Sequence, residues 1–297
     1  MHTPRVVIAD GENAAGAAFV HLLTQRGYRV TLLTREPADD SRAVQHVAWD
    51  GETAGPWTRV LEGACGLVNL HGAGLDPHAH DGLATASALS RALSECADPP
   101  PVWLQAGSVR VYGASNGARP ADECTALGGD AEARAWHAIE EELRQTVSSG
   151  VRRAVYRLGL VLDEDSSSRQ RLSALARWAH ESPAARMETP LSWIHADDLA
   201  RLLYWGLRME IIAGPYNACV PGTARLKDVC RALPEAAGSG ASERNTPAAV
   251  PGPLVHATPR RFIDIAYQFR NENLAQAIGP AKAARMRREQ AVEPALR

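Results

Sequence analysis

The feature that most constrains the fold is an alternation of short apolar runs with amphipathic stretches, which begins near the first residue. A β-branched run at 5–9 is followed by a turn and by a helical stretch at 14–28, where apolar residues recur at helical spacing. The next run, 29–35, is almost continuously apolar, as in strands that are buried on both faces of a parallel sheet. The first 35 residues therefore predict a β-α-β unit.

The same alternation continues as far as Leu162. Strands are predicted at 43–49, 66–72, 101–108 and 153–162, and helices at 83–97 and 131–148. Strands that alternate with helices favour an α/β fold, here a doubly wound parallel sheet of the Rossmann-like kind. We expect a dinucleotide-binding domain over 1–162.

After Leu162 the alternation weakens, and 163–170 is polar enough to predict a surface loop. We expect a smaller C-terminal substrate lobe over 163–297, with 193–220 returning to the Rossmann-like core. Residues 234–259 are rich in Pro, Gly, Ala and Ser and predict a long irregular connection.

Composition excludes several classes of partner. The chain of 297 residues carries a formal net charge of -2, so it has no basic field for a nucleic-acid backbone or an anionic membrane surface. No apolar run is long enough for a membrane span.

The cysteines are odd in number, widely spaced and free of any C-x-x-C pair, which predicts reduced thiols and a cytoplasmic location. We expect no metal site.

Six short motifs stand in a characteristic order. With them the chain resembles the extended short-chain dehydrogenases/reductases, and within these the atypical group of NAD(P)-dependent proteins called the epimerase family. The motifs are NLHGAG, GSVRVYG, YRLGLVL, LSWIHADDL, GPYNACVPG and AYQFRNENLAQAI.

The resemblance implies a G-x-x-G-x-x-G loop after the first strand, whose glycines allow a tight turn and a close approach of the pyrophosphate. These three positions fall on Asp10, Asn13 and Gly16, with an additional glycine at Gly11. We expect Gly11, Asn13 and Gly16 to line the cofactor, and Asn13 to adopt the left-handed backbone. The Asp10 carboxylate would repel a pyrophosphate unless its side chain turns away to bond other groups.

Two further positions bear on the cofactor. Thr34 and Arg35 stand where the resemblance implies an acidic residue that bonds the ribose of NAD, and an arginine there favours the 2′-phosphate of NADP. We therefore expect NADP, with NAD as the less favoured cofactor. Asn69 and His71 follow the fourth strand, at the sheet edge where open α/β folds bind ligands, and are expected to contact the cofactor ribose.

The resemblance implies a catalytic serine, tyrosine and lysine. Ser108 matches the serine, whereas the tyrosine position falls near Glu132 and the lysine position near Trp136, so the Tyr–Lys pair is absent. A tyrosine needs an adjacent cation to act as a base at neutral pH. The standard reaction therefore cannot be assumed.

Three residues are candidate replacements for the missing acid or base: Tyr112, His137 and His195. Each of these parts of the chain could instead have a purely structural role. Tyr112 would pack after its strand and His137 would lie on a solvated helix face. Near His195, the acidic pair Asp197 and Asp198 would cap a helix.

Three functions remain open from the sequence. The leading hypothesis is an NADP-linked oxidoreductase or epimerase-like enzyme that acts on a small polar carbonyl or hydroxyl compound, with Ser108 orienting the substrate. The alternative is a catalytically silent Rossmann-fold protein that binds a nucleotide or a partner as a sensor or scaffold. The third is a lyase or isomerase that uses His195 or His137. Helices 83–97 and 131–148 could pair two subunits in a homodimer.

Overall fold

The fold is described from a computed structural model of the chain. The structure describes residues 3–36, 38–72, 82–113, 119–146, 150–163, 166–222, 224–233 and 254–278.

A seven-stranded sheet forms the centre of the molecule, and every pairing in it is parallel. Its order is β3-β2-β1-β4-β5-β6-β10, so the direction of winding reverses between β1 and β4. The predicted doubly wound α/β fold is confirmed. The strands are β1 Arg5–Ala9, β2 Arg29–Thr34, β3 Val44–Ala48, β4 Gly66–Asn69, β5 Val102–Ser108, β6 Arg152–Leu158 and β10 Gly214–Ala218.

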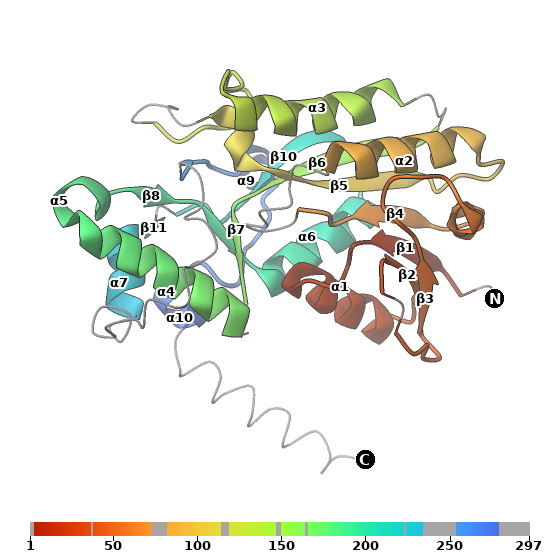
Figure 1. Cartoon of the computed structure of the whole chain (residues 1–297), viewed down its shortest axis with the longest axis horizontal. Coiled ribbons are helices and arrows are strands. Elements are labelled where there is room, and N and C mark those ends of the chain that lie inside the picture. Colours follow the sequence, from red (N-terminus) through yellow and green to blue (C-terminus); the bar gives the residue numbers. More distant parts are fainter. Residues whose placement is uncertain are drawn as a thin grey trace, which may run out of the picture.

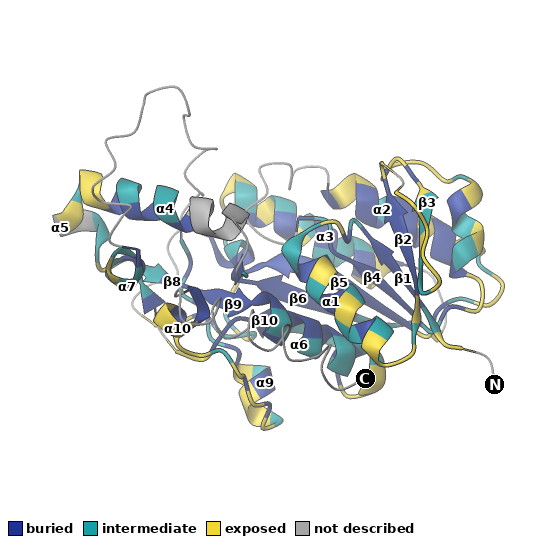
Figure 2. Cartoon of the chain, turned by 90° about the horizontal axis from the view of Figure 1, so that it is seen from below, coloured by how far each residue is buried: buried dark blue, intermediate teal, exposed yellow. Residues whose placement is uncertain are grey.

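Helices cover both faces of the sheet. Helices α1 (Ala14–Gln25) and α6 (Ala196–Arg208) lie against one face, and α2 (Gly82–Glu95) and α3 (Ala131–Gln145) against the other (Figure 1). The central strands are therefore buried on both sides, whereas the outward faces of α1, α2 and α3 carry exposed residues (Figure 2). This explains why the strands are continuously apolar in sequence.

A smaller group of elements lies beyond one end of the sheet (Figure 1). Two short pairings lie outside the main sheet: β7 runs parallel to β9, and β8 runs antiparallel to β11. The elements outside the main sheet and its covering helices are η1 Pro56–Leu61, η3 Val109–Tyr112, β7 Leu160–Leu162, α4 Ser166–Glu181, α5 Pro183–Arg186, β8 Pro190–Leu191, β9 Trp193–His195, β11 Ala224–Arg225, α7 Leu226–Ala232, α9 Arg260–Asp264 and α10 Leu274–Ile278.

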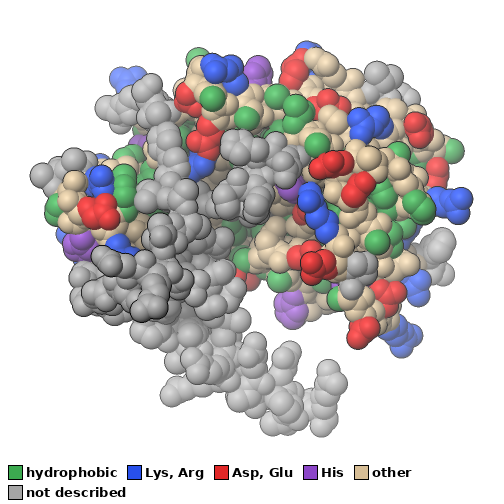
Figure 3. Space-filling model, in the orientation of Figure 1, with side chains coloured by type: hydrophobic (Ala, Val, Ile, Leu, Met, Phe, Trp, Pro, Cys, Tyr) green, Lys and Arg blue, Asp and Glu red, His purple; other side chains and the backbone are tan. Residues whose placement is uncertain are grey.

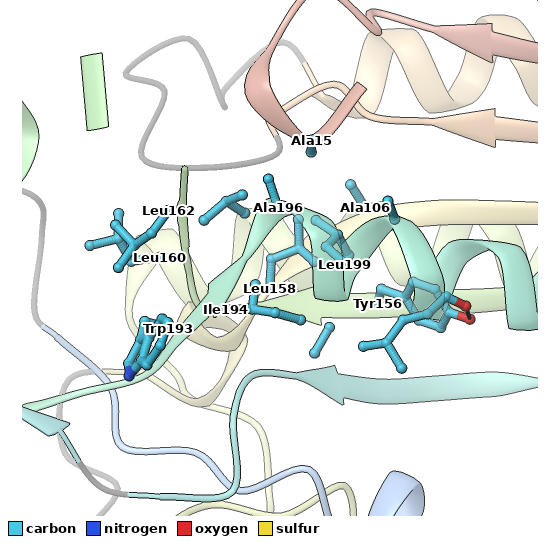
Figure 4. Close-up of a cluster of buried hydrophobic side chains, with 14 of the residues drawn as sticks. Ala15, Ala106, Tyr156, Leu158, Leu160, Leu162, Trp193, Ile194, Ala196 and Leu199 are labelled. Atoms are coloured by element: carbon cyan, nitrogen blue, oxygen red, sulfur yellow. Dashed lines mark hydrogen bonds between the residues drawn. The ribbon is translucent and has the colours of Figure 1, made fainter. Parts of the chain in front are cut away.

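Buried side chains join this smaller group to the sheet. Tyr156 and Leu158 of β6, Leu160 of β7, Trp193 of β9 and Leu199 of α6 belong to one cluster (Figure 4). Burial of a large apolar side chain contributes about 2 kcal/mol, so the joint is held mainly by the hydrophobic effect.

Two predicted elements were wrong. The strand predicted at 153–162 is divided at Gly159, where an added Cβ would lie 2.6 Å from backbone atoms of Ser192, so this close backbone approach separates β6 from β7. The loop predicted at 163–170 contains the start of α4 at Ser166. The polar first turn hid this helix, which is anchored by apolar residues further along: Leu172, Leu175, Ala176 and Ala179.

Most of the irregular connection predicted at 234–259 lies outside the described residues. Its described part, 254–259, contains an isolated parallel bridge between Ala257 and Ala121.

On the surface, acidic and basic side chains are interspersed on the face drawn in Figure 3, in keeping with the small net charge. Among the described helices, none combines the length and apolar character that a bilayer crossing requires.

A buried carboxylate holds the C-terminal segment on α6. Asp198 is 0% exposed and accepts hydrogen bonds from the backbone amides of Arg270 at 3.0 Å and Asn271 at 2.8 Å. The Asn271 side chain donates to it at 3.0 Å, and Arg201 pairs with it. The charge of Asp198 is thus neutralised within the fold.

We expect Asp198→Ala to lower the free energy of unfolding by about 3 kcal/mol, because it leaves two partly buried backbone amides and the Arg201 cation without their acceptor. Chemical denaturation checks this. The neighbouring Asp197 is only half buried, so Asp197→Ala is the matched control, with an expected loss of about 0.5 kcal/mol. Equal losses for the two variants would contradict the assignment.

Candidate functional site

The candidate site lies where the loops after β1 and β4 meet, at the point where the strand order reverses. Asp10 has φ 51°, a left-handed backbone that favours glycine. The first loop therefore keeps the backbone turn that the resemblance implies at this position, although the residue is an aspartate.

The Asp10 carboxylate turns away from the loop and toward His71. Its Oδ2 forms a hydrogen bond with Nδ1 of His71, and both side chains are mostly buried. An ionised carboxylate only accepts, so Nδ1 of His71 is the donor. The backbone amide of His71 donates to Asn69 Oδ1 at 3.0 Å. Thus the carboxylate that would repel a pyrophosphate is engaged by an imidazole.

Asn13 holds the loop but does not adopt the predicted left-handed backbone. Its φ of -110° and ψ of 173° are extended, because it is the N-cap of α1: its side chain accepts from the Gly16 amide at 3.0 Å. The same side chain donates to the carbonyls of Asp10 at 3.0 Å and Leu70 at 3.3 Å. The prediction of a left-handed Asn13 was wrong, and the cap explains why asparagine is suited to the position.

The two glycines of the loop allow close packing. A Cβ on Gly16 would lie 2.0 Å from the Gly11 carbonyl oxygen, and a Cβ on Gly11 would lie 2.9 Å from Ile8 Cγ2. The first turn of α1 carries no acidic residue. The positive end of the α1 dipole therefore meets no acidic side chain within the first turn of the helix.

At the end of β2, Thr34 and Arg35 contact different parts of the chain. The buried Thr34 hydroxyl donates to the carboxylate of Glu12, which comes from the first loop, and it accepts from the Glu36 amide at 3.1 Å. Arg35 is exposed, and its guanidinium lies beside Gly51. Glu12 was not among the site residues predicted from the sequence. Its position in the loop, between Gly11 and Asn13, could have indicated it.

Asn69 is fully buried, and its side chain bonds other parts of the protein. Its Nδ2 donates to Gln105 Oε1 at 3.0 Å, and its Oδ1 accepts from His71. In this structure Asn69 therefore fixes the backbone of the loop after β4. Cofactor contact by Asn69 and His71 stays a prediction.

Ser108 ends β5 at the same edge of the sheet. The residue is buried, and its Oγ accepts from the Arg110 amide at 3.2 Å, so it caps the short helix η3. The Arg110 guanidinium pairs with Glu132 in the first turn of α3, and Trp136 is buried one turn further. The helix face matched to the tyrosine and lysine thus carries a glutamate and a tryptophan.

Tyr112 is the centre of a buried polar network. Its hydroxyl donates to Asn217 Oδ1 at 2.8 Å and accepts from Arg157 Nη1 at 2.8 Å. Arg157 also binds both carboxylate oxygens of Glu140 at 2.7 Å. Burial raises the pKa of Tyr112 to about 12, although the Arg157 cation acts against this rise. Such a phenol is unsuited to proton transfer at neutral pH.

The predicted histidines have different surroundings. His195 is buried at the start of α6, and its Nδ1 accepts from the Asp197 amide at 3.1 Å, so His195 itself is the N-cap. The interpretation that Asp197 or Asp198 caps this helix was wrong. His137 is exposed on α3, as its structural interpretation predicted.

We expect Tyr112→Phe to lower the free energy of unfolding by about 1 to 2 kcal/mol at pH 8, because Asn217 and Arg157 each lose a partner. Wild-type Tyr112 keeps its proton in the folded state up to about pH 12, whereas an unfolded tyrosine loses it near pH 10.0. Its stabilising contribution is therefore complete below pH 10 and decreases between pH 10 and 12.

Denaturant unfolding of both proteins from pH 8 to 12 measures this difference. The gap between wild type and variant should narrow as the pH rises above 10. A gap that widens, or a change in cofactor affinity in the variant, would show that the hydroxyl has another role.

The chain is similar to known proteins along most of its length. No family model matches the chain. The epimerase family protein SDR39U1 of Bos taurus is 27% identical over 252 residues, covering 79% of this chain and 81% of that protein. The human SDR39U1 is 25% identical over 251 residues, covering 79% and 80%, and YfhF of Bacillus subtilis is 22% identical over 232 residues, covering 75% and 76%.

Solved structures share the fold. The structure of human SDR39U1 with NADPH superposes with a TM-score of 0.69 at 21% identity, covering 92% of this chain and 97% of that one. WbmH of Bordetella bronchiseptica with NAD+ gives 0.70 at 16% identity, covering 94% and 98%. A nucleoside-diphosphate sugar epimerase of Corynebacterium glutamicum gives 0.74 at 21% identity; it covers 98% of this chain, which spans only 62% of that protein.

These similarities confirm the resemblance predicted from the motifs. In sequence the chain is SDR39U1-like, and its fold is that of the NAD(P)-dependent epimerases and dehydratases of the extended short-chain dehydrogenase/reductase group.

Proposed function

We propose that the protein is an NADP-linked oxidoreductase or epimerase-like enzyme that acts on a small polar carbonyl or hydroxyl compound. The observation that carries the proposal is the first loop. It keeps a left-handed residue at Asp10 and the close approach of Gly16 to Gly11 although two glycines of the motif are replaced. Human SDR39U1, which shares the fold, has been solved with NADPH.

The pyrophosphate would lie over the N-terminus of α1. Asn13 occupies one amide there, that of Gly16, and no acidic residue stands in the first turn. His71 engages the Asp10 carboxylate from the side of β4. This arrangement supports anion binding at the helix N-terminus despite the aspartate.

The adenosine end supports NADP through Arg35. A guanidinium binds a phosphate strongly, whereas the Glu12 carboxylate of the first loop is engaged by the Thr34 hydroxyl. The preference for NADP over NAD then depends on which of these two charges the ribose 2′-group meets.

We expect Arg35→Ala to weaken NADPH binding about tenfold and NADH binding less than about twofold, since only NADPH carries the 2′-phosphate. Calorimetric titration measures both affinities. Arg42→Ala, which removes another exposed arginine, is the control. An equal loss for the two cofactors would mean that Arg35 does not contact the 2′-phosphate.

When bound, the nicotinamide would accept or supply a hydride. The chain's own part at the reacting end is Ser108. Its Oγ accepts from the Arg110 amide, which leaves the hydroxyl proton to donate to a substrate oxygen. Of the three predicted catalytic residues only Ser108 is kept in the proposal, because Tyr112 and Nδ1 of His195 are engaged in the interior network and in the helix cap.

We expect Ser108→Ala to lower kcat about 100-fold on any carbonyl substrate found by following NADPH oxidation, because one donor to the developing negative charge is lost. Ser94→Ala is the control, since the Ser94 hydroxyl bonds only the Ser90 carbonyl of its own helix in the described structure. Unchanged turnover in Ser108→Ala would remove this residue from the mechanism.

A silent Rossmann-fold protein is the second candidate. It is favoured by one observation: Glu132 and Trp136 stand where the resemblance places the proton-transferring tyrosine and its lysine. Tight NADPH binding without turnover across a broad carbonyl and alcohol screen would support this candidate.

A further inference from the structure

The end of β2 is met by a carboxylate that comes from another part of the chain. At this position the resemblance implies an acidic residue that bonds the ribose of NAD, and the chain has Thr34 instead. The Thr34 hydroxyl donates to Oε1 of Glu12, which belongs to the loop after β1. Thr34 is fully buried, whereas Glu12 is exposed. An exposed acidic group therefore stands at the end of β2 although the strand itself supplies none.

The Thr34 hydroxyl has only one proton to donate. Besides Glu12, the carbonyl oxygen of Glu36 is an acceptor within reach, at 3.2 Å. The Glu36 backbone amide donates to the hydroxyl oxygen at 3.1 Å. Because an ionised acceptor forms the stronger hydrogen bond, the proton goes to Glu12. While Glu12 is bound, the hydroxyl has no proton left for a ligand.

Arg35 follows Thr34 directly in the chain and is the cation at this end of the strand. Its guanidinium lies beside Gly51, where Nη2 is 2.9 Å from the position that a Cβ on the glycine would take. Within the described part of the chain, no ion pair holds Arg35. The arginine is therefore set differently from Glu12, which is bound to the strand end by a hydrogen bond.

The 2′-group of the ribose distinguishes the two cofactors chemically. NADP carries a phosphate with nearly two negative charges, whereas NAD carries a neutral hydroxyl that can donate a hydrogen bond. A carboxylate repels the phosphate and accepts from the hydroxyl. An arginine favours the phosphate. Glu12 and Arg35 therefore act on the choice of cofactor in opposite directions.

We propose that Glu12 is a specificity-determining residue that acts against the 2′-phosphate of NADP. Its carboxylate takes the Thr34 proton that the phosphate would otherwise receive, and its charge repels the phosphate. NADPH binds Arg35 once Glu12 has left Thr34, and the freed hydroxyl then donates to the phosphate. The preference for NADPH is therefore narrower than Arg35 alone would give. This inference rests on the proposed function, because it places the cofactor ribose at the end of β2.

The test is a calorimetric titration of the full chain with NADPH and NADH, and with the fragments adenosine 2′,5′-bisphosphate and AMP. The two fragments differ only in the 2′-phosphate, so they report on this end of the cofactor alone. Glu12→Gln should bind NADPH and the bisphosphate about tenfold more tightly, because it removes the charge and keeps the size of the side chain. NADH and AMP should bind equally well or up to about twofold more weakly.

Glu36→Gln is the matched control. It removes another exposed carboxylate next to Arg35, but Glu36 reaches Thr34 only through its backbone in the described structure. The ratio of NADPH to NADH affinity should therefore change less than about twofold.

The double variant Thr34→Val/Glu12→Gln tests the part of the hydroxyl. Valine keeps the shape of threonine but has no proton to donate, so the gain in NADPH affinity should fall by about threefold or more, with NADH affinity unchanged. A role of Glu12 that is only structural, as a link between the first loop and β2, would instead weaken both cofactors alike in Glu12→Gln.

Thermal unfolding of each variant shows whether the fold is retained. If Glu12→Gln does not fold, Glu12→Asp replaces it, since the shorter side chain withdraws the carboxylate from Thr34; the ratio of NADPH to NADH affinity should then rise about threefold.

Three results would overturn the proposal: an unchanged ratio of NADPH to NADH affinity in a folded Glu12 variant, an equal gain in Glu36→Gln, or no binding of any cofactor or fragment at millimolar concentration. Failure of the proposed function has a different signature. In that case NADPH binds and responds to the Glu12 variant, but no carbonyl or hydroxyl compound is turned over.

Discussion

The contact between Asp10 and His71 is the interaction on which the candidate site depends. It joins the loop after β1 to the loop after β4, where the sheet reverses its order. A left-handed backbone costs a residue other than glycine about 1 to 2 kcal/mol, and a charge-assisted hydrogen bond is strong enough to offset this. The aspartate can thus occupy a left-handed position that the resemblance assigns to a glycine.

On α3, too, residues of another kind stand at positions that the resemblance assigns to particular residues. Glutamates at Glu132 and Glu140 pair with Arg110 at the sheet edge and with Arg157 inside. The inner pair supports the Tyr112 hydroxyl. Glu132 and Trp136 stand at the positions on α3 that the resemblance assigns to the tyrosine and the lysine, so α3 offers no tyrosine–lysine pair for proton transfer.

The sequence predicted the fold well because strands buried on both faces and amphipathic helices leave strong periodic signals. The prediction failed where a single close contact or a polar first turn determines where an element begins or ends, as at Gly159 and Ser166. In the site, the positions of the loop residues could be predicted, but their partners could not. Asp10 and His71 are 61 residues apart, and their contact requires β1 and β4 to be neighbours. Asn13 serves as a helix cap, a role that its motif position did not indicate.

The most direct test of this account is a calorimetric titration of NADPH into the wild-type protein, His71→Ala and the double variant Asp10→Gly/His71→Ala. If His71 holds the Asp10 carboxylate away from the pyrophosphate, the wild type binds NADPH with micromolar affinity. His71→Ala then binds at least about tenfold more weakly, and the double variant recovers the affinity. No binding to the wild type at millimolar NADPH, or wild-type affinity in His71→Ala, would contradict it.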